Sequence, residues 1–308
     1  MFCQTLPYKA QVFLAGTDYF SNVAFEGWNN NPHRGSDPVR NIYVYDDSAH
    51  GFVNFMSLRG ACRKVSANEL GNRLAVIQAI PGKEHGENVL SMWIFDADRK
   101  KIIDVNNVYD FKWLRNDSIV FVSGSASEDN EIGGFSPTGT WILSLRSKKP
   151  QKIFDEGYWI SVDERSHTIY IDNYWKVYAF DYSIGVLHET KLNGNCFSPN
   201  GKYYYRSRSV YWPFVLYEAS SNRPVKVSGI DSSAEYALWL NQREETLVAG
   251  NYYGEKKIID VGTSKTLGYI SGKIIGFTKE RNAEAIVIKD KRHFKSLSAS
   301  KVEKIKLN

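Results

Sequence analysis

Short apolar and aromatic runs that end in an acidic or polar residue recur along the chain. The clearest lies in Val177–Leu187, where V-Y-A-F-D is followed by a short polar turn and then by further apolar residues. This alternation of an apolar run, a turn and an apolar run predicts a β-hairpin. Related runs recur around the chain and end at the anchor residues Asp46, Asp96, Ser144, Asp181, Glu218, Asp260 and Ser298.

A second hairpin pattern precedes each anchor. In Cys196–Tyr205 the sequence is C-F-S-P-N-G-K-Y-Y-Y, with one apolar or aromatic run on each side of Ser-Pro-Asn-Gly. Proline presets φ and glycine takes a positive φ, so this tetrad is strong turn chemistry. Each repeat therefore predicts two hairpins, or four strands. Helical periodicity is hard to find anywhere in the chain.

The spacing of the anchors predicts the architecture. They are 37 to 50 residues apart and fill the 308-residue chain. Repeats of this length, each needing its neighbours to bury its faces, indicate one all-β domain over 1–308, a β-propeller. We expect seven four-stranded blades, with six as the alternative if the first repeat is irregular. The approximate blades are 10–58, 59–107, 108–156, 157–194, 195–232, 233–272 and 273–308.

The turn F-S-P-N-G at Phe197–Gly201 and the hairpin pattern apolar-Asp-x-x-[Ser/Thr/Gly] resemble the WD40-like and YVTN-type families of seven-bladed propellers. The resemblance covers essentially the whole chain and implies the propeller fold. It does not imply a function, because propellers host many unrelated activities. The Gly-His and Trp-Asp dipeptides of true WD40 repeats are absent. The ring must close between the first and last blades, and residues 2–8 beside Val302–Leu307 are one way to close it.

Composition narrows the classes of partner. The net charge is +5, with lysine and arginine scattered along the chain, and the basic run at Lys289–Lys295 is interrupted by an aspartate. We expect a solvated loop there and no nucleic-acid partner. The three cysteines have neither metal-ligand nor disulfide-framework spacing, so no metal and no cofactor is expected. We see no signal peptide and no apolar run long enough for a membrane span, so the expected compartment is the cytoplasm.

The loops between the second and third strands of each blade are the candidate binding face. In such a blade they share one end with the connections between blades, and loops on a rigid scaffold often carry function. The first three are long (27–41, 81–91 and 123–139), and the later ones are short and aromatic. The predicted partner-binding residues are Trp28, His33, Arg34, Tyr174, Trp175, Tyr211, Trp212, Tyr252, Tyr253, His293 and Phe294. The structural alternative is that one aromatic of each pair packs over the blade and the other starts a strand.

Enzyme motifs are missing from the sequence. Nucleophile elbows, phosphate-binding loops and metal-ligand spacings do not occur, and Ser136–Trp141, which echoes a sialidase-like motif, is predicted to be a turn. The first hypothesis is therefore a non-enzymatic scaffold that binds another protein and is a monomer when free. A specific version is an inhibitor or immunity protein that neutralises an enzyme. The alternative is a hydrolase or lactonase with a site at the central channel mouth, whose catalytic residues the sequence does not identify.

Overall fold

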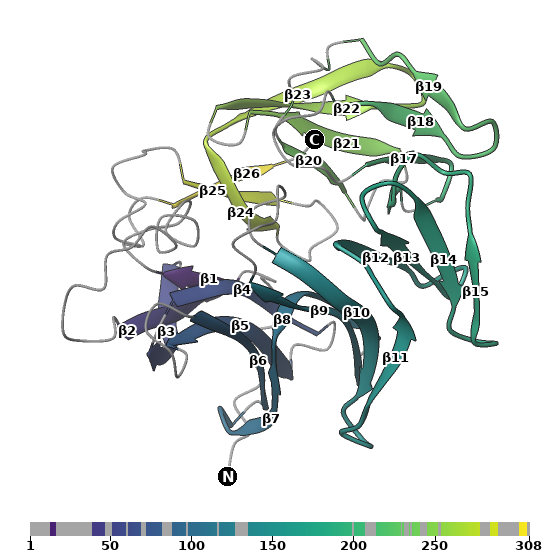
Figure 1. Ribbon diagram of the computed structural model, residues 1–308. Coiled ribbons are helices and arrows are strands. Elements are labelled where there is room, and N and C mark those ends of the chain that lie inside the picture. The colour runs from purple at the N-terminus through teal and green to yellow at the C-terminus, as the bar shows by residue number, and fades with distance from the viewer. Residues whose placement is uncertain are drawn as a thin grey trace. The chain divides into compact units, whose positions relative to one another are not determined.

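A computed structural model describes most of the chain as strands and turns (Figure 1). The described residues are 13–16, 39–46, 51–59, 61–68, 72–81, 88–96, 98–115, 117–126, 135–198, 200–206, 214–228, 230, 234, 236–240, 245–251, 254–277, 284–288 and 302–306. Within these ranges every regular element is a strand, which confirms the predicted all-β class.

The strands form successive antiparallel sheets. Within each sheet the strands follow chain order, and the described residues contain five four-stranded and two three-stranded sheets. The sheets of the N-terminal half are β1 (Phe13–Gly16), β2 (Val39–Asp46) and β3 (Gly51–Arg59); β4 (Ala61–Ala67), β5 (Arg73–Pro81), β6 (Asn88–Asp96) and β7 (Lys101–Asn106); and β8 (Val108–Leu114), β9 (Ser118–Ala126), β10 (Phe135–Ser144) and β11 (Pro150–Phe154).

Four more sheets follow in the same manner. They are β12 (Trp159–Asp163), β13 (Thr168–Asp172), β14 (Val177–Asp181) and β15 (Val186–Glu189); β16 (Cys196–Phe197), β17 (Tyr203–Tyr205), β18 (Leu216–Glu218) and β19 (Arg223–Val225); β20 (Tyr236–Trp239), β21 (Thr246–Gly250), β22 (Glu255–Asp260) and β23 (Lys265–Ser271); and β24 (Lys273–Phe277), β25 (Glu284–Ile288) and β26 (Val302–Lys306). Repeated four-stranded meanders of this kind are the sheet organisation of a β-propeller.

The chain divides into two compact units. The first contains the sheets from β1 to β11, and the second contains those from β12 to β23 with most of the β24–β26 sheet. The single domain predicted for 1–308 and its blade boundaries remain predictions. The proposed closing strand at residues 2–8 lies outside the described residues.

In the five four-stranded sheets the repeated anchor residues end the third strand. Asp96, Asp181, Glu218 and Asp260 are the last residues of β6, β14, β18 and β22. Their side chains accept hydrogen bonds from the turn that follows: Asp181 Oδ1 accepts from the Ser183 backbone N–H at 2.8 Å and from its hydroxyl at 2.6 Å. These bonds lower the pKa of the Asp181 carboxyl. The repeated acid is thus a turn-capping residue. Aspartate suits this role because its carboxylate accepts hydrogen bonds from nearby backbone N–H groups.

Both faces of the inner strands are buried, which fits sheets stacked one against the next. In β5, Leu74 and Val76 pack in one apolar cluster with Ile42 of the β1–β3 sheet. Ala75 and Ile77 of the same strand pack on the opposite face with residues of the β8–β11 sheet such as Phe121. Side chains alternate between faces along a strand, so a continuous apolar run supplies two neighbouring interfaces.

Two of the predicted middle loops, 81–91 and 123–139, are shorter than the sequence suggested. Strand β9 continues to Ala126 and β10 begins at Phe135, so only 127–134 separates them, in place of the predicted 123–139. The predicted turn at Ser136–Trp141 is wrong, because these residues belong to β10 and Ser136 pairs with Ser125. The Pro and Gly that suggested a turn instead mark a register shift between Pro137 and Gly139. A β-bulge accommodates such residues within a strand.

Candidate functional site

The candidate site is the β13–β14 turn, Asp172–Lys176, which carries the sequence-predicted residues Tyr174 and Trp175. The Asn173 amide oxygen accepts the backbone N–H of Lys176 at 2.9 Å, and the Asn173 N–H donates to the Lys176 carbonyl at 3.0 Å. This side-chain cap closes the turn without any glycine. Tyr174 takes a left-handed φ of 80°, which costs a non-glycine residue roughly 1–2 kcal/mol unless other contacts hold it.

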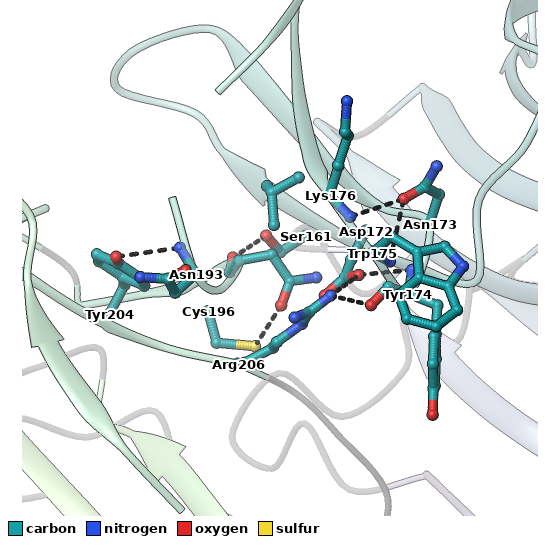
Figure 2. Close-up of polar contacts among 12 residues, drawn as sticks. Ser161, Asp172, Asn173, Tyr174, Trp175, Lys176, Asn193, Cys196, Tyr204 and Arg206 are labelled. Carbon is teal, nitrogen blue, oxygen red and sulfur yellow. Dashed lines mark hydrogen bonds and ion pairs between the residues drawn. The ribbon is translucent and has the colours of Figure 1, made fainter. Parts of the chain in front are cut away.

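A buried ion pair holds the turn in place (Figure 2). Asp172 is fully buried, and its carboxylate accepts two bonds from the Arg206 guanidinium, at 2.6 Å to Nε and 2.7 Å to Nη2. Arg206 Nη2 also donates to the Tyr174 carbonyl at 2.5 Å, and Asp172 Oδ1 accepts the Tyr174 N–H at 2.8 Å. Both polar groups of the left-handed residue are therefore bound by the same pair. Such two-pronged contacts fix geometry as well as adding energy.

The pair also joins two sheets of the second unit. Asp172 ends β13, whereas Arg206 directly follows β17 of the next sheet. Ser161 of β12 adds to this junction, because its hydroxyl donates to the Asn195 backbone carbonyl just before β16. Next to that contact, the Cys196 thiol donates to the amide oxygen of its neighbour Asn195 at 3.6 Å (Figure 2). Cys196 lies half-buried in β16 and packs against the apolar cluster that contains Tyr205 and Trp239. These contacts position strands and provide no nucleophile–base pair.

The two aromatics of the turn have different surroundings. Tyr174 is half-buried and stacks on Trp159 with ring centroids 6.2 Å apart and an interplanar angle of 28°. Trp175 meets the edge of the Tyr174 ring at 5.0 Å and 82°, and it remains 80% exposed. One aromatic of the pair thus packs over the sheet while the other faces outward. A supported tryptophan with this exposure is a candidate binding anchor.

A charged pair borders the exposed tryptophan. Lys176 Nζ lies 2.8 Å from Glu189 Oε2 on β15, and both side chains are about half exposed. The hydrogen bond to the Glu189 carboxylate raises the pKa of Lys176. The charges of Lys176 and Glu189 neutralise each other, as do those of Asp172 and Arg206. The turn therefore presents an apolar ring surrounded by satisfied polar groups.

A buried lysine supports the corresponding turn of the β20–β23 sheet. Lys256 is fully buried, and its Nζ donates to the backbone carbonyls of Gly254 at 3.2 Å and Gly272 at 2.6 Å. Gly254 closes the β21–β22 loop, and Gly272 lies between β23 and β24. Burial lowers the pKa of Lys256 to about 8. The ammonium thus links the middle loop to the connection that leaves the sheet.

Of the predicted partner-binding residues, Tyr174 and Trp175 lie in the described turn, and their role in binding remains a prediction. The residues that position them were not predicted. Asp172 and Arg206 are 34 positions apart, and no sequence motif links them. The only signal in the sequence is that each lies at the end of a predicted strand. The other predicted partner-binding residues lie outside the described residues: Trp28, His33, Arg34, Tyr211, Trp212, Tyr252, Tyr253, His293 and Phe294. Within the described ranges, no group of three or more His, Cys, Asp or Glu side chains could hold a metal ion. None of the elements described there is a helix long and apolar enough to cross a membrane.

Comparison with known proteins gives no family. No protein-family model matches the chain, and no curated protein sequence matches it. Among solved structures, the chain is similar to the crystal structure of Saccharomyces cerevisiae Sqt1. The two are 11% identical, the match covers 89% of this chain and 92% of that chain, and the TM-score is 0.49.

Proposed function

We propose that this protein is a non-enzymatic, seven-bladed β-propeller that binds a partner protein through the face carrying the β13–β14 turn. The observation that carries the proposal is Trp175, which is 80% exposed on a turn that a buried ion pair holds rigid. Tryptophan is enriched among the residues that dominate binding energy at protein interfaces. A preorganised anchor also pays less ordering entropy when it binds.

The remaining features of the turn fit the same role. The Lys176–Glu189 pair lies at the rim, where charges influence specificity and association rate more than affinity. The finer version of the proposal is a cytoplasmic monomer whose partner is an enzyme that it neutralises, as an inhibitor or immunity protein does. That version predicts that the captured partner loses its activity when the propeller is added in equimolar amount.

The prediction for binding is that Trp175→Ala weakens partner binding at least about thirtyfold, because a hot-spot tryptophan is worth roughly 2 kcal/mol or more. The partner is sought by affinity capture from lysate of the producing organism with the tagged protein, followed by quantitative mass spectrometry. The dissociation constant of the purified pair is then measured for each variant. Because Trp175 is exposed, its removal should leave the melting temperature near that of the wild type.

Tyr269→Ala is the matched control. Tyr269 is another exposed aromatic of the second unit, 57% exposed on β23, away from the β13–β14 turn in sequence and sheet. Its replacement should leave partner binding unchanged. A partner that binds the wild type and the Trp175→Ala variant with equal affinity would contradict the proposal.

A further inference from the structure

The last strands of the four-stranded sheets differ in how their outer edges are protected. An open edge can pair with another chain, and proteins usually block it with prolines, bulges or lysines. Four of these five edges in the described residues carry such a device. They are a register shift at Ile94/Phe95 beside β7, one at Thr140/Trp141 beside β11, Pro224 within β19, and one at Ile258/Ile259 beside β23.

Strand β15 is short and carries Glu189, but it has no proline, no lysine and no register shift. It pairs with β14 in unbroken register, from Tyr178 opposite Glu189 to Asp181 opposite Val186. Its sequence, V-L-H-E, contains neither proline nor lysine. Within the described ranges no strand lies on its other side, since β15 ends the sheet order. Its outer edge therefore has the regular geometry that another strand needs for pairing.

The direction of the β15 backbone groups follows from its pairing. The Thr190 N–H donates to the Val177 carbonyl at 2.9 Å, one step beyond the end of the strand. Hydrogen-bonded pairs alternate along antiparallel strands, so His188 and Val186 also bond toward β14. The N–H and C=O groups of Leu187 and Glu189 consequently point away from β14, toward the outer edge.

Exposed apolar side chains gather at both ends of this strand. Ile184, in the β14–β15 turn, is 70% exposed and Val186 is 49% exposed. Trp175 lies at the other end, next to Lys176, whose ammonium contacts Glu189 of β15. These are three of the four large hydrophobic residues that are exposed in the described part of the chain, Tyr269 being the fourth. An unprotected edge and an apolar surround thus occur together on one sheet.

We infer that the edge of β15 binds an extended, apolar-rich segment of a partner protein, which adds to the sheet as a further strand. The segment would pair with the main chain of Leu187 and Glu189 and place alternate apolar side chains against Ile184 and Val186. Strand addition draws affinity from main-chain bonds and specificity from alternate side chains. The main-chain groups of Leu187 and Glu189 that would pair are distinct from the Trp175 side chain, and the inference stands without the proposed function.

The size and charge of the edge favour a peptide segment over a second copy of the chain. Four residues of strand span only about 13 Å. A stable dimer needs roughly 800 Å² of buried surface on each partner, far more than such an edge supplies. Glu189, the one carboxylate of the strand, is already paired with Lys176. An uncharged segment therefore fits better than a strongly charged one.

The test selects ligands from a phage-displayed library of random 12-residue peptides on the immobilised full-length protein. A selected peptide is then synthesised, and its affinity is measured by fluorescence anisotropy. We expect peptides with alternating apolar residues. Leu187→Pro should weaken their binding at least about tenfold, because it removes an outward N–H and leaves a peptide carbonyl unpaired. Leu187→Ala keeps that N–H and is the matched control, expected to bind within about threefold of the wild type.

A second measurement covers the case in which Leu187→Pro does not fold. Hydrogen exchange of the wild-type protein, followed by mass spectrometry, should show slower exchange in the segment 183–190 when the peptide is bound. Equal affinity of the folded Leu187→Pro variant, or unchanged exchange in this segment, would overturn the inference. Peptide binding that depends on Trp175 and not on Leu187 would also overturn it and would support the turn instead. Concentration-dependent dimerisation abolished by Leu187→Pro would show that a second copy occupies the edge.

Discussion

Replacing Asp172 by alanine should lower the free energy of unfolding by about 3–5 kcal/mol. Asp172 is fully buried, and the Arg206 side chain is only 17% exposed. Removing the carboxylate leaves the guanidinium in a poorly solvated position without its counter-charge. It also frees the Tyr174 N–H from its acceptor, so the left-handed turn loses part of its support. Urea unfolding followed by tryptophan fluorescence measures the change.

Two further variants identify the cause of this loss. Asp104→Ala removes a carboxylate whose pair with Lys101 is exposed on both sides, and it should cost less than about 1 kcal/mol. The double variant Asp172→Leu/Arg206→Met removes both buried charges together and should lose less than the sum of the two single changes. Equal destabilisation by Asp172→Ala and Asp104→Ala would contradict the role given to the buried pair.

The second large effect is expected from Lys256 and depends on pH. Burial lowers the pKa of this lysine to about 8 in the folded protein, from 10.5. Between these two values the unfolded chain binds more protons than the folded one, so stability rises with pH in this window. The stability gained when Lys256 loses its charge is absent below about pH 8, where the lysine is protonated in both the folded and the unfolded protein. It is complete above about pH 10.5, where the lysine is neutral in both. Its full size is on the order of 3 kcal/mol, since one pKa unit corresponds to roughly 1.4 kcal/mol.

The measurement compares the wild type with Lys256→Met at pH 7.5, 9 and 10. Other lysines and tyrosines also titrate at high pH, and the difference between the two proteins cancels their contributions. The free energy of unfolding of the wild type should rise relative to that of the variant over this range. Parallel pH profiles for the two proteins would show that Lys256 is not titrating in the buried environment that the structure gives it.

The recurring hairpin pattern could be predicted from sequence because its information is local. Asp181 ends an apolar strand and is followed by Ser183 and Gly185, and these few residues contain both the strand and its capped turn. The same holds for the Ser198–Gly201 turn, where Gly201 has a φ of 71° and the Ser198 hydroxyl donates to Asn200. Local hydrogen bonds and φ preferences act within a few residues, so they leave a readable signal.

Part of the local signal was misleading. The Pro and Gly of Ser136–Trp141 indicated a turn, but the strand pairing of β9 and β10 extends through them. Ladder hydrogen bonds and burial of Thr140 and Leu143 outweigh the local preference, and the strain is taken up in a bulge. Turn propensity therefore predicted a break where tertiary pairing keeps a strand.

The sequence by itself determined the all-β class, the repeated hairpins and the aromatic pair in the β13–β14 turn. Tertiary structure decided which aromatic is available, because Tyr174 packs on Trp159 and leaves Trp175 exposed. It also brought Asp172 to Arg206, a contact that no spacing rule predicts, because it depends on how one sheet lies against the next. The unprotected edge of β15 emerged in the same way, since its regular register and its place at the end of the sheet are properties of strand pairing.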